Sequence, residues 1–228
     1  GMSPWRMMNE WGVPPVELHT LCYRYVKELA DKGKHVPAIT VAGGFTFEDQ
    51  MYKGLALGAP FVKLVGMARA PIAAAMVGKT IGKTIDEGNI PVYVERFGRS
   101  KDEIFVTSAN LRKELGNDAY EKLPTGAIGL YTYYERLAQG LRQLMAGTRK
   151  FTTSHISRDD LASLTRECAD ISGIPHVMDV DKKEAEKLIR SVAGAKGNAG
   201  SKSKSKTKSK TKSKTKSKSK SKRAATVS

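Results

Sequence analysis

The chain has 228 residues, and its hydrophobic content of 40% is ordinary for a protein that can bury one core. The formal net charge of +16 is concentrated in residues 201–223, which hold eleven lysines, one arginine and no acid, while residues 1–195 carry 26 basic and 23 acidic side chains. A charge argument for nucleic acid therefore applies to the tail alone, and the two cysteines and four scattered histidines form neither a disulfide framework nor a metal site.

The first predicted elements alternate between helix and strand. Apolar residues recur at helical spacing over residues 16–31, and Gly33 ends this helix. Residues 36–41 form an apolar run rich in β-branched side chains between two glycine-containing turns, which is typical of a buried strand. Thr46 is placed to cap the next helix, with Asp49 three residues further on.

A second unit of the same kind follows. Residues 61–65 predict another buried strand, and Pro71 suits the first turn of a helix over residues 72–81. Strands that alternate with helices imply parallel strands joined by right-handed crossovers. Val41 and Val65 are equivalent points on the two strands, and their separation of 24 residues is typical of β/α barrel units.

The second half of the chain has weaker patterns. Residues 90–94 and 104–108 are predicted as short strands or extended loops. Three amphipathic helices are expected beyond them, at residues 133–145, 157–172 and 181–192. Ser157 caps the middle helix, with Asp160 at its third position. The apolar face of that helix is expected to consist of Leu161, Leu164, Cys168 and Ile171.

From residue 194 the composition changes abruptly. Residues 201–222 alternate Ser or Thr with Lys and contain no apolar side chain, so nothing offsets the entropy of ordering and the segment is predicted to be disordered. The expected organisation is an N-terminal part over residues 1–85 that holds the two β/α units, a C-terminal extension over 86–193 that is mainly helical after 130, and a disordered basic Lys-Ser/Thr tail over 194–228.

The most informative feature is that each predicted strand ends in a glycine turn that leads into a helix. A phosphate needs several backbone N–H donors, and glycine lets the backbone approach it closely. A helix N-terminus adds unpaired N–H groups and a partial positive charge. In β/α barrels the turns after the last two strands often build such a phosphate site. Either turn, taken alone, is also compatible with a simple tight entry into a helix.

The predicted phosphate site has ten residues, which follow the two strands. Most of them are expected to offer backbone N–H groups, while Thr46 adds a hydroxyl and Arg69 a charge-assisted hydrogen bond. The ten residues are Ala42, Gly43, Gly44, Phe45, Thr46, Val65, Gly66, Met67, Ala68 and Arg69.

Three stretches of the chain resemble the end of the FMN domain of glutamate synthases, and look most like its compact, archaeal-type members. They read AGGFT at residues 42–46, KGLALGAP at 53–60 and VGMARA at 65–70. The run RLAQGL at residues 136–141, followed by a helix over 157–172, also resembles the way in which those domains finish.

The resemblance implies an α/β fold that holds the last two β/α units of a TIM (β/α)8-type barrel, followed by C-terminal helices and the Lys/Ser tail. It implies FMN as the cofactor, with its phosphate held by the two turns. It also implies an oxidoreductase of glutamate biosynthesis, acting on CH–NH2 donors, as the complete enzyme. The family's catalytic residues lie in strands that this chain lacks, so none is assigned here.

Two absences relative to the family have consequences. No cysteine occurs in residues 70–130, where the family carries iron–sulfur ligands, so no iron–sulfur cluster is expected from this chain. The first six barrel strands have no counterpart, so we expect either a partner chain that supplies them or self-association. The chain alone is not expected to be an active enzyme.

The alternative hypothesis is a catalytically inactive barrel remnant that acts as a binding or scaffold protein. Its basic residues 201–223 would contact nucleic acid without sequence preference. The tail is also compatible with binding to other anionic surfaces, with a solubilising or phosphorylatable segment, and with a repeat expansion that has no selected role.

The longest apolar stretch, residues 55–78, is interrupted by Lys63, Arg69 and two prolines, so it is not expected to span a membrane. No secretory signal is visible. We therefore expect a cytoplasmic protein with no membrane partner, in which Cys22 and Cys168 are buried, reduced thiols.

Overall fold

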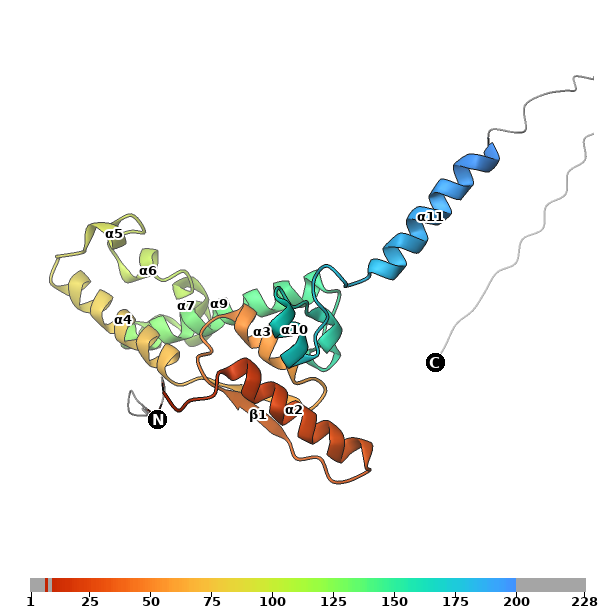
Figure 1. Cartoon of the computed structure of the whole chain (residues 1–228). Coiled ribbons are helices and arrows are strands. Elements are labelled where there is room, and N and C mark those ends of the chain that lie inside the picture. The colour runs from red at the N-terminus through yellow and green to blue at the C-terminus, as the bar shows by residue number, and fades with distance from the viewer. Residues whose placement is uncertain (1–6, 8–9, 200–228) are drawn as a thin grey trace, which may run out of the picture. The chain divides into compact units, whose positions relative to one another are not determined.

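The computed structural model describes residue 7 and residues 10–199, and it describes side chains as far as residue 192. The chain divides into two units at Asp181 (Figure 1). Within the described residues, no helix is long and apolar enough to cross a membrane. Both cysteines are free, and each is half-buried rather than fully buried as expected.

The first unit begins with the predicted order of helix, strand, helix, strand and helix. These elements are α2 (Pro15–Asp31), β1 (Ile39–Ala42), α3 (Glu48–Leu57), β2 (Val62–Gly66) and α4 (Arg69–Asp86). These elements could be predicted from the sequence because each carries its own local signal, such as a proline in the first turn of α2. Helix α4 is longer at both ends than the predicted range of 72–81.

The two strands form a parallel sheet, as predicted from the helix between them. Val41 lies opposite Val65, which confirms the predicted equivalence of these two positions. Thr40 lies opposite Leu64, and Ala42 lies opposite Gly66. The glycine turns that follow the two strands are therefore brought to the same end of the sheet.

The start of α3 differs from the prediction, because Thr46 does not cap it. The side-chain oxygen of Gln50 accepts hydrogen bonds from the N–H groups of Thr46 at 2.8 Å and Phe47 at 3.1 Å. The hydroxyl of Thr46 instead donates to the carbonyl of Gly44 at 3.4 Å. Phe47 is the first flanking residue of the helix, and the reach of Gln50 back over the first turn takes the place of a hydroxyl cap.

The prediction of strands or extended loops around residues 90–94 and 104–108 is wrong. The segment folds into short helices: α5 (Val92–Glu95), α6 (Lys101–Ile104), α7 (Ser108–Leu115) and α8 (Asn117–Glu121). Helix α6 begins with a capping box, because the hydroxyl of Ser100 accepts from the N–H of Glu103 and the carboxylate of Glu103 accepts from the N–H of Ser100.

These short helices are held by a small core. Its buried members are Phe105, Leu111, Tyr120 and Ile128. The hydroxyl of Tyr120 donates to Asp102 at 2.8 Å, and the guanidinium of Arg112 lies 4.3 Å from the centre of the Tyr120 ring. The core joins residues from several separate elements, so the pattern within any one element does not reveal it.

Helix α9 (Thr125–Gly147) is longer than the predicted range of 133–145 and lies side by side with α4 (Figure 1). The two helices approach through glycines. A Cβ on Gly78 would lie 2.7 Å from the carbonyl oxygen of Thr125, and a Cβ on Gly129 would lie 2.9 Å from the Cα of Gly78. Close backbone packing therefore offsets the poor helix propensity of these glycines.

The prediction of a single helix over residues 157–172 is wrong, although the capping box predicted for its start is present. Ser157 and Asp160 cap only a short 3-10 turn, η2 (Arg158–Asp160). The chain then extends, and Ser163 forms an isolated parallel bridge with His176. Helix α10 (Arg166–Ser172) starts afresh behind Thr165, whose hydroxyl accepts from the N–H of Cys168.

The extended connection breaks the predicted apolar face of that segment. Leu164 is 79% exposed, and only Leu161 packs against a core cluster. That cluster lies between α3 and α9, and its member Ile156 directly follows the 3-10 turn η1 (Thr153–His155). Its buried members are Tyr52, Ala56, Met145 and Ile156.

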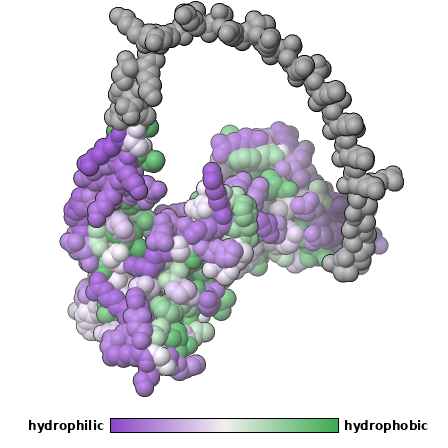
Figure 2. Space-filling model, turned by 90° about the vertical axis from the view of Figure 1, so that its right-hand side faces the viewer, coloured by the Kyte–Doolittle hydropathy of each residue, from purple (hydrophilic) through white to green (hydrophobic). Residues whose placement is uncertain are grey.

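Helix α2 leaves most of its predicted apolar face uncovered. Val26 is buried, but the other large side chains of the stripe are exposed, namely Leu18, Leu21, Tyr25 and Leu29. Figure 2 shows hydrophobic residues, in green, reaching the surface on the face that it displays. The first unit therefore carries apolar surface that its own core does not use.

The second unit contains α11 (Lys182–Ala199). The predicted helix over 181–192 is confirmed, and it continues past residue 194, where the tail was expected to begin. The predicted disordered segment from residue 200 onward lies outside the described residues.

Candidate anion site at two glycine turns

The turns after β1 and β2 line one open hollow of about 670 Å³. Nine of the ten predicted site residues line it, together with Ala70 and Ala73 of α4. Val65 does not line it and lies just before the second turn, in the strand. The turns are separated in sequence by a helix and a strand, and the parallel register brings them together.

The first turn has a backbone that favours glycine. Gly43 and Gly44 have φ angles of +128° and +76°, which side-chain-bearing residues rarely adopt. A Cβ on Gly44 would meet no atom within 4 Å, so the requirement at that position is conformational rather than steric. The absence of both side chains leaves the peptide groups of this turn open to close approach by a ligand.

The second turn needs glycine for a different reason. A Cβ on Gly66 would lie 3.2 Å from the Cβ of Ala42, its partner across the sheet. Such a contact is tight, so a larger residue would force the ends of the two strands apart. Gly66 therefore helps to keep the two turns close together.

The N-terminus of α3 has little to offer an anion. Its entry amides, those of Thr46 and Phe47, already donate to Gln50. Its first turn also carries two carboxylates, Glu48 and Asp49, which compensate the positive end of the helix dipole. The backbone N–H of Thr46 is therefore engaged elsewhere. The Thr46 hydroxyl, which the sequence analysis assigned to the phosphate, donates to the carbonyl of Gly44.

The N-terminus of α4 has the opposite character. Its first turn contains no acid and begins with Arg69. Pro71 has no N–H, and the N–H of Ile72 bonds to the carbonyl of Ala68 at 3.4 Å. The amides of Arg69 and Ala70 are thus the ones that the helix itself leaves unpaired, and both residues line the hollow.

The side chain of Phe45 packs against residues of α2 and α3. Its ring stacks on His19 with 5.8 Å between the ring centres and an angle of 3° between the planes. It also covers Gly54, where a Cβ would lie 2.7 Å from the Phe45 ring. Phe45 therefore contributes only its backbone to a ligand in the hollow.

His19 is a site-supporting residue that the sequence did not reveal. It is 7% exposed, and burial lowers the pKa of its imidazole, while a hydrogen bond to the backbone of Ala42 partly opposes this change. The ring is consequently neutral at physiological pH. No local signal points to it, since it lies on α2, far from the turn in sequence.

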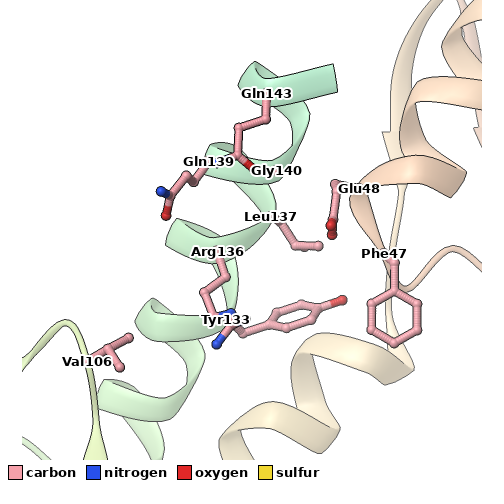
Figure 3. Close-up of a pocket in the computed structure, with 9 residues that line it drawn as sticks. All are labelled: Phe47, Glu48, Val106, Tyr133, Arg136, Leu137, Gln139, Gly140 and Gln143. Atoms are coloured by element: carbon pink, nitrogen blue, oxygen red, sulfur yellow. The ribbon is translucent and has the colours of Figure 1, made fainter. Parts of the chain in front are cut away.

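A second hollow, of about 570 Å³, lies between the start of α3 and the face of α9. Figure 3 shows Tyr133, Arg136 and Leu137 of α9 on one side of it, with Phe47 and Glu48 on the other. The remaining lining residues are Val106, Gln139, Gly140 and Gln143.

Tyr133 connects this second hollow to the first. Its hydroxyl donates to the carbonyl of Thr46 at 2.5 Å, which ties the first glycine turn to α9. Burial raises the pKa of Tyr133, so the phenol stays protonated and remains a donor. The contact to Thr46 gives this tyrosine a defined structural partner.

The chemistry available in the first hollow is that of binding. Among its lining residues Arg69 alone is ionisable, so the described chain offers no acid or base there for proton transfer. No group of His, Cys, Asp or Glu side chains in the described residues is arranged to hold a metal ion.

No family model matches the chain, and no match is found among curated proteins or solved structures.

Proposed function

We propose that this chain is the phosphate-binding end of an FMN-dependent, glutamate-synthase-like oxidoreductase. The observation that carries the proposal is the hollow in which two glycine turns meet the acid-free N-terminus of α4 and the guanidinium-bearing Arg69. Bound flavin supplies the hydride-transfer chemistry of such an enzyme. The part of this chain is to hold and orient the phosphate.

The charge arrangement favours a phosphate at α4 over one at α3. A cation in the first turn of a helix is disfavoured by the helix dipole unless an anion lies nearby. Arg69 occupies that position in α4, whereas α3 carries Glu48 and Asp49 at the equivalent place. A phosphate in the hollow would offset both the guanidinium charge and the unpaired amides of α4.

The exposed face of the sheet supports the proposal that further strands complete the barrel. The described residues form only two strands, and both strands have an unpaired edge. Leu64 is 64% exposed, and on the same face Thr40 and Ala42 are exposed as well. In a closed barrel this face points inward and packs against side chains of the other strands. The described residues leave that face uncovered.

The number of helices per strand favours a partner chain over self-association as the source of the other six barrel strands. A (β/α)8 barrel has one helix for each strand. The two strands here already have α2 before them, α3 between them and α4 after them. A partner with six strands and five intervening helices completes the set, whereas a ring of four copies brings twelve helices to eight strands.

The test compares FMN with riboflavin, because the two differ in the phosphate. The full chain is titrated into each flavin, alone and together with a chain that supplies six β/α units, and the flavin fluorescence is followed. We expect FMN to be quenched at lower protein concentration than riboflavin, and Arg69→Gln to weaken FMN binding about tenfold or more.

The matched control is Arg142→Gln, because Arg142 is an exposed arginine that lines neither hollow. This control is expected to bind FMN as the unchanged chain does. Equal binding of FMN and riboflavin would remove the phosphate site. The absence of FMN binding in both the single-chain and the two-chain experiment would remove the flavin proposal.

A further inference from the structure

The second unit presents an apolar stripe that none of its described residues covers. Leu188, Ile189 and Val192 of α11 are 61%, 68% and 61% exposed. Ile189 and Val192 lie one and four residues after Leu188, so the three share one face of the helix, and Ala185 lies on the same face. Two turns of α11 are therefore amphipathic.

The remainder of that helical segment is charged. Residues 182–192 contain four basic side chains and two acidic ones, and one of the acids, Glu186, is paired with Arg190 at 3.6 Å. The sequence then runs into residues 196–223, which hold twelve lysines, one arginine and no acid. A short aliphatic stripe and a long cationic segment are thus adjacent along the chain.

We infer that α11 and the basic segment after it bind together to an anionic phospholipid surface. An amphipathic helix with basic residues on its polar side lies in the membrane interface with its apolar face toward the acyl chains. Lysine clusters next to such a helix are attracted by the negative surface potential of anionic lipids. Each feature alone is weak, and stable attachment takes two such signals.

The aliphatic stripe is what favours lipid over nucleic acid. Nonspecific nucleic-acid binding comes from phosphate contacts and counterion release, which require the lysines but leave Leu188, Ile189 and Val192 exposed to water. A lipid interface accommodates both the charges and the stripe. The expectation of no membrane partner was based on the lack of a spanning segment, and attachment to a surface requires no spanning segment.

Charge also disfavours a second copy as the occupant of the stripe. Two parallel α11 helices would bring two segments of thirteen positive charges into the same region, and like charges repel. The stripe also covers only two turns, which is short for a stable helix pair. An anionic surface neutralises the same charges that oppose pairing.

The experiment sediments the full chain with vesicles of phosphatidylcholine and with vesicles of phosphatidylcholine mixed with phosphatidylserine. We expect co-sedimentation with the anionic vesicles alone, reduced by added salt. The double variant Leu188→Ser/Ile189→Ser is expected to lower the binding to anionic vesicles roughly tenfold, because it removes apolar groups from the interface. The matched control is Leu164→Ser, at an exposed leucine of the first unit.

Two outcomes would overturn the inference. One is that the double variant binds anionic vesicles as tightly as the unchanged chain while both bind a random DNA duplex more tightly than vesicles, which assigns the segment to nucleic acid. The other is that the unchanged chain is a dimer that the double variant converts to a monomer, which assigns the stripe to a second copy. Circular dichroism of the double variant verifies that its helix content is unchanged.

Discussion

Arg158 donates a hydrogen bond from its Nη1 to the carbonyl of Leu57, joining residues 101 positions apart. Its Nη2 donates to the carbonyl of Ser172, and its guanidinium lies 4.1 Å from the centre of the Tyr23 ring. One side chain therefore caps the last turns of α3 and α10 and also contacts α2. This one side chain therefore joins three helices.

Replacing Arg158 should destabilise the first unit. Arg158→Leu removes both charge-assisted hydrogen bonds, and we expect the free energy of unfolding to fall by about 2–3 kcal/mol. Arg158→Lys should recover little of this loss, since an ammonium group cannot reach two carbonyls in the planar fork geometry. Chemical denaturation followed by circular dichroism measures the change. Arg142→Leu, at an exposed arginine, should change the value by less than about 0.5 kcal/mol.

Gly44→Ala should separate the conformational cost of the first turn from ligand binding. The positive φ of Gly44 makes the substitution cost about 1–2 kcal/mol of stability. Gly33 has a similar φ and, like Gly44, no atom within 4 Å of an added Cβ, so Gly33→Ala should cost about as much. Only Gly44→Ala should also weaken phosphate binding in titration calorimetry, because Gly33 lies outside the hollow. Equal binding by the two variants would contradict the site.

Asp160 should make stability depend on pH in the acid range. Burial by itself would raise its pKa, but the backbone N–H of Ser157, the ammonium of Lys150 and the hydroxyl of Tyr52 outweigh this effect, so its pKa lies below the ordinary value of 3.8. Because the pKa is lower in the folded chain, the contribution of Asp160 is fully present above 3.8 and is lost as the pH falls through the folded value.

The variant Asp160→Asn measures that contribution. We expect it to be less stable than the unchanged chain at neutral pH, and we expect the difference to shrink as the pH falls below 3.8. Unfolding curves collected across that range provide the measurement. A difference that stays constant over the whole range would show that the carboxylate charge has no role.

The glycine contact between α4 and α9 should not tolerate a methyl group. A Cβ at Gly78 would lie 2.7 Å from the carbonyl of Thr125, which is backbone and cannot rotate away. We expect Gly78→Ala to cost about 1–3 kcal/mol, despite the better helix propensity of alanine. Gly147 of α9 has no atom within 4 Å of an added Cβ, so Gly147→Ala should be neutral or stabilising by up to about 1 kcal/mol.

The elements that the sequence predicted correctly are those with signals contained in a few neighbouring residues. The two strands, their parallel pairing and the register of Val41 with Val65 follow from apolar runs, glycine turns and the spacing between them. The meeting of the two turns in one hollow follows from the same register. These features needed no knowledge of distant contacts.

The errors arose where distant residues decide the structure. Tyr120 and Ile128 stabilise a core around residues that the sequence alone predicted as short strands or extended loops. Ser163 pairs its backbone with residues 175–177, so the chain is extended where the sequence predicted a helix, and the capping box at Ser157 starts only a short 3-10 turn. At the site, Gln50 takes the Thr46 amide in competition with any ligand, and residue type alone does not decide such a competition.

The glycine contact between α4 and α9 also bears on the proposed anion site. Backbones in direct contact cannot slide past each other without opening a void or a clash, so α4 has one position along α9. Ala70 and Ala73, which form one wall of the hollow, are carried by that same helix. This wall of the hollow is therefore preorganised, and a phosphate that binds there as proposed should lose little free energy to its rearrangement.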